Sequence, residues 1–178
     1  MIPISLKEFL RNGAFGPVKG SISRSKLKGL LGSPDDFMCL PRGKEEFYAL
    51  DSSGKPVHVR AKRPPNADHA GIWKYGSFEF HFNAGRVGML YADHFDRLQG
   101  GSTIRVSPWK LRGQVQRTAI QVELEKLGVG YHVRQPDYDP TQMLLLTDSG
   151  VELSFIEKKE QFAPSFGLWA ITRCWRSK

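Results

Sequence analysis

The feature that most constrains the fold is a pair of similar strand-like segments, residues 72–82 (IWKYGSFEFHF) and residues 143–155 (MLLLTDSGVELSF). Each contains an apolar run, a glycine, a glutamate and a closing phenylalanine. In the first segment phenylalanines alternate with polar residues from Phe78 to Phe82. This period of two is typical of a strand whose sheet buries one face. The two segments raise the question of whether the chain repeats a larger unit.

The first half begins with helix signals. Ser5 and Glu8 fit a capping box, which predicts a short helix over residues 6–11 that ends at Gly13. After the loop AFGPVKG, Ser21 or Ser23 caps a second helix that Gly32 ends. Strand patterns follow in FMCL, IWKYG, FEFHF and RVGMLYAD, with a segment at about 42–70 that reads as an inserted hairpin and loop.

The second half starts after the glycine-containing junction RLQGGST (residues 97–103). Ser107 and Pro108 predict a short helix that ends near Gly113. A longer helix, QRTAIQVELEKLG, ends at Gly128. The runs YHVR, MLLLT, VELSF and GLWAITRCW then predict four more strands.

The order of elements is therefore the same in both halves. The helix end at Gly32 corresponds to Gly128, 96 residues later, whereas residues 78–82 correspond to 151–155, 73 residues later. The difference of 23 is about the length of the segment at 42–70. The sequence predicts an α+β fold of two tandem repeats, each helix-helix-antiparallel four-stranded sheet, over residues 1–99 and 100–178.

Parts of this pattern resemble known families. The run KGSISRSKLKGLLGSPDDF followed by IWKYG is similar to a pattern in secreted β-lactamase inhibitor proteins and in small lipoproteins of outer-membrane β-barrel assembly. FEFHF and the order LG, SGVEL, GLWAI also resemble bacterial polymorphic-toxin immunity proteins. The resemblance implies a tandem helix-helix-sheet fold that grips a partner protein with a concave sheet and loops, and it implies no catalytic residue.

The chain departs from the exported families in two ways. Its start, MIPISLKEFL, does not read as a secretory signal, and it carries no lipid-attachment cysteine. Cys39 and Cys174 are far apart and outside any CxxC pair, which favours two reduced, buried thiols. We therefore expect a cytoplasmic protein without a membrane span.

The charge balance favours anionic partners. Lysine and arginine number 26 against 18 acidic residues, a net charge of +8. Such a charge speeds encounter with an acidic protein surface, a nucleic acid or a membrane. The alternative interpretation is that the charge only keeps the protein soluble.

A search for reaction chemistry finds little. The five histidines lack metal-ligand spacing, and no phosphate-binding loop is present. Glu79 and His81 share one strand face and could meet at a substrate or ion, or form an ordinary polar face. Asp93 and His94 lack a recognisable nucleophile. The sequence thus predicts a protein that is not an enzyme and has no cofactor.

Nucleic-acid binding is the alternative function. The segment 42–66 carries basic residues with Phe47 and Tyr48 close by, a combination that can follow phosphates and stack on bases. The whole segment 42–70 holds six basic and four acidic residues, so its charge is mixed. Such a hairpin is equally suited to a protein surface.

We expect a non-enzymatic immunity or inhibitor protein that covers the active site of a toxin or enzyme with an acidic surface. Tyr, Trp and Arg are the residues that most often anchor such interfaces, although Trp169 could equally pack between sheet and helix. The candidate partner-binding residues are Glu79, His81, Tyr91, Glu152, Trp169, Arg173, Arg60 and Arg63.

Overall fold

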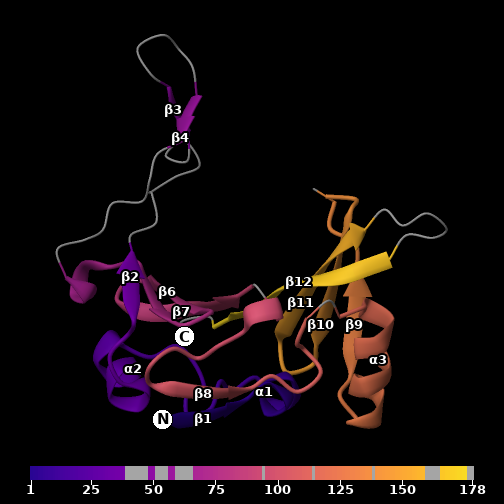
Figure 1. The fold of residues 1–178 in the computed structure, drawn as a ribbon, viewed down its shortest axis with the longest axis horizontal. Coiled ribbons are helices and arrows are strands. Elements are labelled where there is room, and N and C mark those ends of the chain that lie inside the picture. The colour runs from indigo at the N-terminus through magenta and orange to yellow at the C-terminus, as the bar shows by residue number, and fades with distance from the viewer. Residues whose placement is uncertain are drawn as a thin grey trace.

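The fold is mixed α+β, as the sequence predicts (Figure 1). The computed structural model describes residues 1–38, 48–50, 56–58, 66–93, 95–113, 115–137, 139–158 and 165–175. In chain order the elements are β1 (Ile2–Ser5), α1 (Leu6–Asn12), α2 (Arg24–Leu31), β2 (Asp36–Met38), β3 (Tyr48–Leu50), β4 (Pro56–His58), η2 (Ala67–His69), β5 (Ile72–Tyr75), β6 (Phe78–Asn83), β7 (Arg86–Ala92), η3 (Phe95–Arg97), β8 (Ile104–Ser107), α3 (Arg117–Lys126), β9 (Tyr131–Arg134), β10 (Gln142–Thr147), β11 (Val151–Lys158) and β12 (Ser165–Cys174).

One eight-stranded sheet organises the molecule. Its strand order is β2-β5-β6-β7-β12-β11-β10-β9, so each half of the chain contributes four neighbouring antiparallel strands. β7 pairs with β12 where the halves meet, and the two expected four-stranded sheets are therefore halves of one sheet. This pairing removes two exposed sheet edges that would otherwise present unpaired N–H and C=O groups. A separate parallel pair, β1 with β8, was not predicted.

The helices of the first half begin and end at the predicted signals. The Ser5 side chain accepts a hydrogen bond from the Glu8 N–H at 3.3 Å, and Gly13 ends α1 with φ of 71°. Ser23, one of the two predicted caps, accepts from the Lys26 N–H at 3.3 Å, and Gly32 ends α2. Local capping chemistry thus fixes both helices.

The short helix predicted after Ser107 is wrong. Residues 108–113 form turns, in which Trp109 has a left-handed φ of 53° and Gly113 a φ of 80°. A right-handed helix cannot pass through such residues. The Gly113 N–H instead donates to the Phe95 carbonyl at 2.9 Å, and Leu111 is fully buried. The described part of the second half therefore contains one helix, α3, where two were expected.

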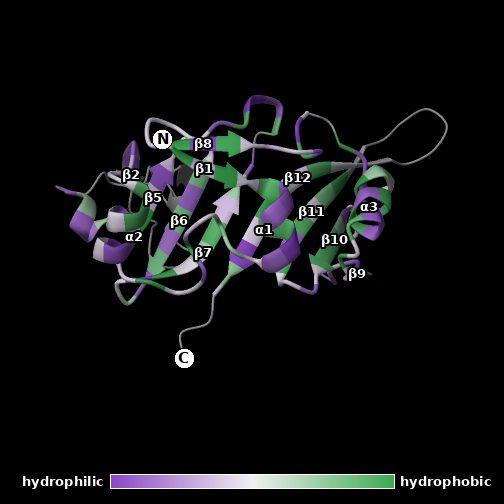
Figure 2. Ribbon diagram, turned by 90° about the horizontal axis from the view of Figure 1, so that it is seen from below, coloured by the Kyte–Doolittle hydropathy of each residue, from purple (hydrophilic) through white to green (hydrophobic). Residues whose placement is uncertain are grey.

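The core lies on one face of the sheet. α1, α2 and the β1–β8 pair lie on that side, as the view from below shows (Figure 2). Phe78, Phe80, Val151, Leu153 and Phe155 are fully buried, as their alternation predicts. Burial of one apolar sheet face against helices is what makes a two-layer α+β fold stable. The other face carries a different set of side chains.

The two halves share an irregularity of pairing. The β6–β7 ladder shifts between His81 and Phe82, where Gly88 is the extra residue of β7. The β11–β12 ladder shifts between Ser154 and Phe155, where Trp169 is the extra residue of β12. Such bulges bend a strand and increase its twist. Phe82 is only half-buried beyond the first bulge.

The segment at 42–70 is described only in part. β3 and β4 pair in antiparallel fashion, within the two runs where the sequence predicts strands. Arg60 and Arg63 lie outside the described residues, as does Cys39. Cys174 is a free thiol and is exposed, so the expectation that it is buried is wrong. Successive side chains of β12 point to opposite faces of the sheet. The side chain of Cys174 therefore lies on the face opposite the core.

Candidate functional site: a polar row on the open face

One row of paired residues crosses all eight strands on the face opposite the core. Successive backbone pairings connect its members, and residues directly opposite one another in neighbouring strands share a face. We call this set the polar row. From β2 to β9 it consists of Asp36, Lys74, Glu79, Tyr91, Thr172, Glu152, Leu146 and His132.

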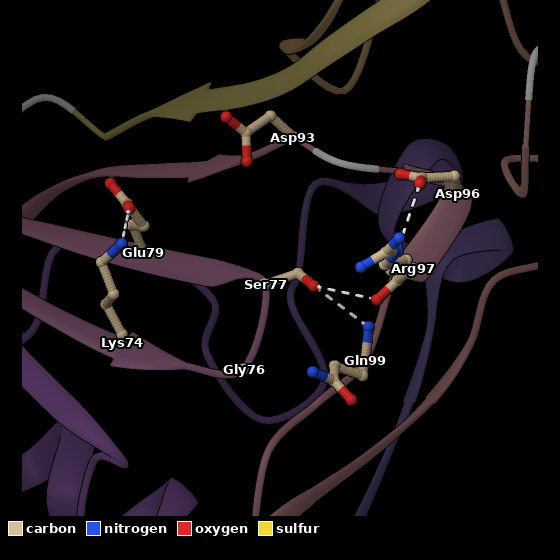
Figure 3. A pocket seen from close by; sticks show the side chains of 8 residues that line it. All are labelled: Lys74, Gly76, Ser77, Glu79, Asp93, Asp96, Arg97 and Gln99. Carbon is tan, nitrogen blue, oxygen red and sulfur yellow. Dashed lines mark hydrogen bonds and ion pairs between the residues drawn. The ribbon is translucent and has the colours of Figure 1, made fainter.

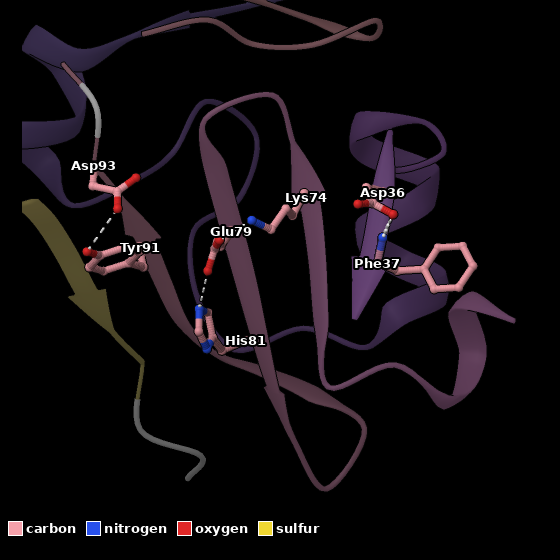
Figure 4. A network of polar contacts seen from close by, with 7 residues as sticks. All are labelled: Asp36, Phe37, Lys74, Glu79, His81, Tyr91 and Asp93. Carbon is pink, nitrogen blue, oxygen red and sulfur yellow. Dashed lines mark hydrogen bonds and ion pairs between the residues drawn. The ribbon is translucent and has the colours of Figure 1, made fainter. Parts of the chain in front are cut away.

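Glu79 is the centre of the hydrogen bonding in this row (Figure 4). Its carboxylate pairs with Lys74 Nζ at 2.6 Å and with His81 Nε2 at 3.1 Å. All three side chains are less than a third exposed. Two partners on one carboxylate hold the side chains in one arrangement, which gives the face a preformed shape.

Tyr91 extends the network toward β12. Its hydroxyl donates to Asp93 Oδ2 at 3.3 Å, and its ring packs edge-on to the ring of His81. Burial, the Asp93 carboxylate and the charge of Glu79 together raise the pKa of Tyr91 to about 12. The phenol therefore stays protonated at neutral pH and acts as a hydrogen-bond donor, not as a base.

A cavity of about 520 Å³ opens beside the row (Figure 3). Its walls come from the β5–β6 turn, the end of β7 and η3. Its charged side chains pair with one another, as Lys74 does with Glu79 and Arg97 with Asp96 at 3.6 Å. Ser77 Oγ accepts from the Gln99 N–H at 3.1 Å. These internal pairings leave the cavity without a single dominant charge.

No metal centre is evident among the residues that the structure describes. Within those ranges, no three His, Cys, Asp or Glu side chains group closely enough to hold a metal ion. The contact between Glu79 and His81 is therefore a two-residue pair supported by Lys74.

The remaining candidate residues fall in different places. Glu152 is in the polar row and pairs with Arg134 at 3.5 Å. Trp169, the bulge residue, is 51% exposed. This exposure favours a place in an interface over packing between sheet and helix. Arg173 lies on the covered face, in register with buried Val151 and Leu90, and contacts the turn at Gly150.

Sequence reasoning missed Lys74 and Arg134 as members of the site. A signal for Lys74 was available, because a two-residue turn at Gly76 and Ser77 places it directly opposite Glu79. Arg134 carries no such local signal. Its contact with Glu152 reaches across β10 and depends on the pairing of three strands.

Comparison with protein-family models, curated proteins and solved structures finds no match for the chain. In the described part of the chain, no helix has the length and apolar character to cross a bilayer.

Replacing Glu79 by glutamine tests whether the network stabilises the protein. Burial opposes ionisation of Glu79, but hydrogen bonds from His81 and Lys74 outweigh it and hold its pKa below the usual 4.5. This stabilisation is present above about pH 4.5 and is lost as pH falls through the lower folded-state pKa. We expect Glu79→Gln to be less stable than wild type at pH 7 and to converge with it as pH falls below the folded-state pKa of Glu79, as measured by urea unfolding.

Glu123→Gln is the control for this pH dependence. Lys126 donates to Glu123 and lowers its pKa, but this pair is on the exposed surface of α3, where solvent screens it. We expect a smaller change than for Glu79→Gln. Parallel stability curves for wild type and Glu79→Gln across this pH range would contradict the role given to the network.

Proposed function

We propose that the chain is a non-enzymatic cytoplasmic protein of the immunity or inhibitor type, which neutralises a partner protein by covering its active site. The observation that carries the proposal is the polar row on the open sheet face. Core formation needs only the opposite face, so the ordered Lys74–Glu79–His81 network is more than folding requires. Preformed side chains lose less freedom on association, which favours binding.

The bend of the sheet supports occlusion as the mechanism. The two halves of the sheet are inclined to each other, and the helices lie along the outside of the bend (Figure 1). The polar row consequently runs across the inner side. A partner seated there would contact strands from both halves at once, which gives a large interface from a small protein.

We further propose that the two halves are copies of one unit. Residues 36–38 of β2 and 132–134 of β9 occupy matching places in their four-stranded halves, 96 residues apart like Gly32 and Gly128. The two register shifts lie 73 residues apart, after His81 on β6 and after Ser154 on β11. Matching by register pairs Gly88 with Trp169, the extra residues of β7 and β12. Duplication supports a binding role because it widens one continuous face.

An affinity pull-down tests the proposal. Tagged protein is incubated with native lysate of its host at low and moderate salt, with nuclease added. We expect one stoichiometric protein partner that survives both treatments and whose activity the purified chain inhibits. The acidic surface expected on this partner follows from the net charge of +8.

Matched charge reversals locate the surface. Arg134 is 59% exposed beside the polar row, whereas Arg105 is exposed on β8, on the covered side. Arg134→Glu should lower recovery of an acidic partner several-fold, and Arg105→Glu should not. Recovery of nucleic acid alone, or turnover of a substrate by the purified chain, would refute the proposal.

A further inference from the structure

A second cavity, of about 530 Å³, lies where β6, β7 and the end of β12 meet the loop before α2. We call it the Arg86 pocket. Its lining includes Ser21, His81, Phe82, Arg86, Met89 and Trp175. Resting on the proposed inhibitor function, we propose that the Arg86 pocket binds a carboxylate side chain of an acidic segment of the partner protein.

The charge of the pocket is the first reason. Arg86 Nη2 donates to the Ser21 carbonyl at 2.6 Å, and Arg24 Nη2 donates to the Ala70 carbonyl at 2.6 Å. Backbone carbonyls therefore fix both guanidinium groups, and among the described residues no carboxylate pairs with either. None of the described residues that line the pocket is acidic.

Arg24 belongs to this cationic region because it stacks on a pocket wall. Its guanidinium carbon lies 4.3 Å from the centre of the Phe82 ring. Such stacking keeps a guanidinium flat while its N–H groups stay available. Two positioned arginines without a counter-charge form a site that a carboxylate can satisfy with paired hydrogen bonds.

The pocket also contains polar groups that lack partners in the described part of the chain. Trp175 is 7% exposed, and among the described residues neither its Nε1–H nor the buried Ser21 hydroxyl has a hydrogen-bond partner. Buried polar groups without partners are uncommon in folded proteins, so each requires an explanation. Carboxylate oxygens that entered the pocket would accept a hydrogen bond from the indole N–H.

Apolar walls indicate a side chain and not a free ion. Phe82, Met89 and Trp175 surround the cationic groups, and methionine adapts its shape to different neighbours. These walls suit the methylene groups of glutamate. His81 connects the pocket to the polar row, since one of its ring nitrogens contacts Glu79 (Figure 4).

Titration with poly-L-glutamate of about 20 residues tests the pocket without a known partner. The Trp175 indole ¹H–¹⁵N signal and the dissociation constant are measured for wild type and three variants. We expect the Trp175 signal to shift and Arg86→Glu to weaken binding about tenfold. Arg105→Glu makes the same charge change on β8 and should alter binding less than about twofold. Arg86→Lys keeps the charge but not the paired donors, and should lie between them.

Three results of these binding measurements would contradict carboxylate binding in the Arg86 pocket. They are an unshifted Trp175 signal, equal weakening by Arg86→Glu and Arg105→Glu, and an Arg86-dependent oligothymidylate complex that poly-L-glutamate does not displace. The last would assign the site to phosphate. If Arg86→Glu retains the pull-down partner fully, the pocket does not bind that partner, whereas the proposed inhibitor function is unaffected. If poly-L-glutamate binds at Trp175 but the lysate yields no protein partner, the inhibitor function is contradicted and the carboxylate site is not.

Discussion

Replacing Gly76 by alanine is expected to destabilise the protein by about 3 kcal/mol, because backbone strain and steric overlap act together. Gly76 connects β5 to β6 with φ of 59°, a conformation that residues with a Cβ atom rarely adopt. An added Cβ would also lie 2.5 Å from the Gly101 nitrogen and closer still to the Gln99 carbonyl oxygen. Both neighbours are backbone atoms, which cannot rotate away. Urea unfolding at pH 7 measures the loss.

The Gly76 N–H adds a further constraint, since it donates to Asp35 Oδ2 at 2.9 Å. Asp35 also accepts from the Ser102 N–H at 2.9 Å and so connects the β5–β6 turn to the segment before β8. Any movement of the turn that relieved the overlap would weaken this bridge. A shift of the turn therefore cannot relieve the overlap in Gly76→Ala without weakening the hydrogen bonds to Asp35.

Gly113→Ala provides the matched control for strain alone. Gly113 has φ of 80°, and an added Cβ would meet nothing within 4 Å. Its substitution should cost only the left-handed penalty of about 1–2 kcal/mol. Equal losses for the two variants would show that the close packing around Gly76 has no energetic effect.

Local signals account for the part of the fold that the sequence predicts. The caps at Ser5 and Ser23 and the glycines that end α1 and α2 act within a few residues, so they are readable from the chain. The strands of both halves likewise follow from alternation and turn residues. The predicted helix after Ser107 failed because its turn is held by a distant contact, from Gly113 to Phe95.

The candidate site was predictable only residue by residue. Alternation places Glu79 and His81 on the open face, and β11 shows the same for Glu152. Which residues stand beside them depends on how strands pair, because a shift of one residue exchanges the two faces. Arg173 illustrates the consequence, since it belongs to the covered face although it is next to Thr172 of the polar row.

Bulges are a second reason why the exposure of residues on the open face could not be predicted, because no local sequence pattern revealed them. Ser154 shares the face of Glu152, yet it is only 6% exposed, next to the irregular pairing with β12. Leu144 and Ala170, its partners across the sheet, are buried as well. The open face is therefore polar and accessible mainly along the first half and the polar row. A partner would contact this part of the sheet first.

Phe15→Ala is expected to cost about 3–5 kcal/mol, the range for removing a large buried side chain. Phe15 comes from the loop between α1 and α2, yet it is fully buried. Its ring centre lies 4.8 Å from that of Phe78 and 5.6 Å from that of Phe9, so it connects α1 to the sheet. Thermal and urea unfolding measure the loss, which would be contradicted by a change below about 1 kcal/mol.

Trp169→Ala removes a larger aromatic side chain and separates stability from binding. Because Trp169 is 51% exposed at the β12 bulge, its loss should change the unfolding free energy by only about 0.5 kcal/mol. An exposed tryptophan on a bulge is also well placed to anchor a partner, and anchor residues often cost 2 kcal/mol or more of binding energy, roughly 30-fold in affinity. We therefore expect Phe15→Ala to reduce partner capture only as far as it unfolds the protein. Trp169→Ala should reduce capture by a fully folded protein, and retention of full affinity would remove Trp169 from the binding surface.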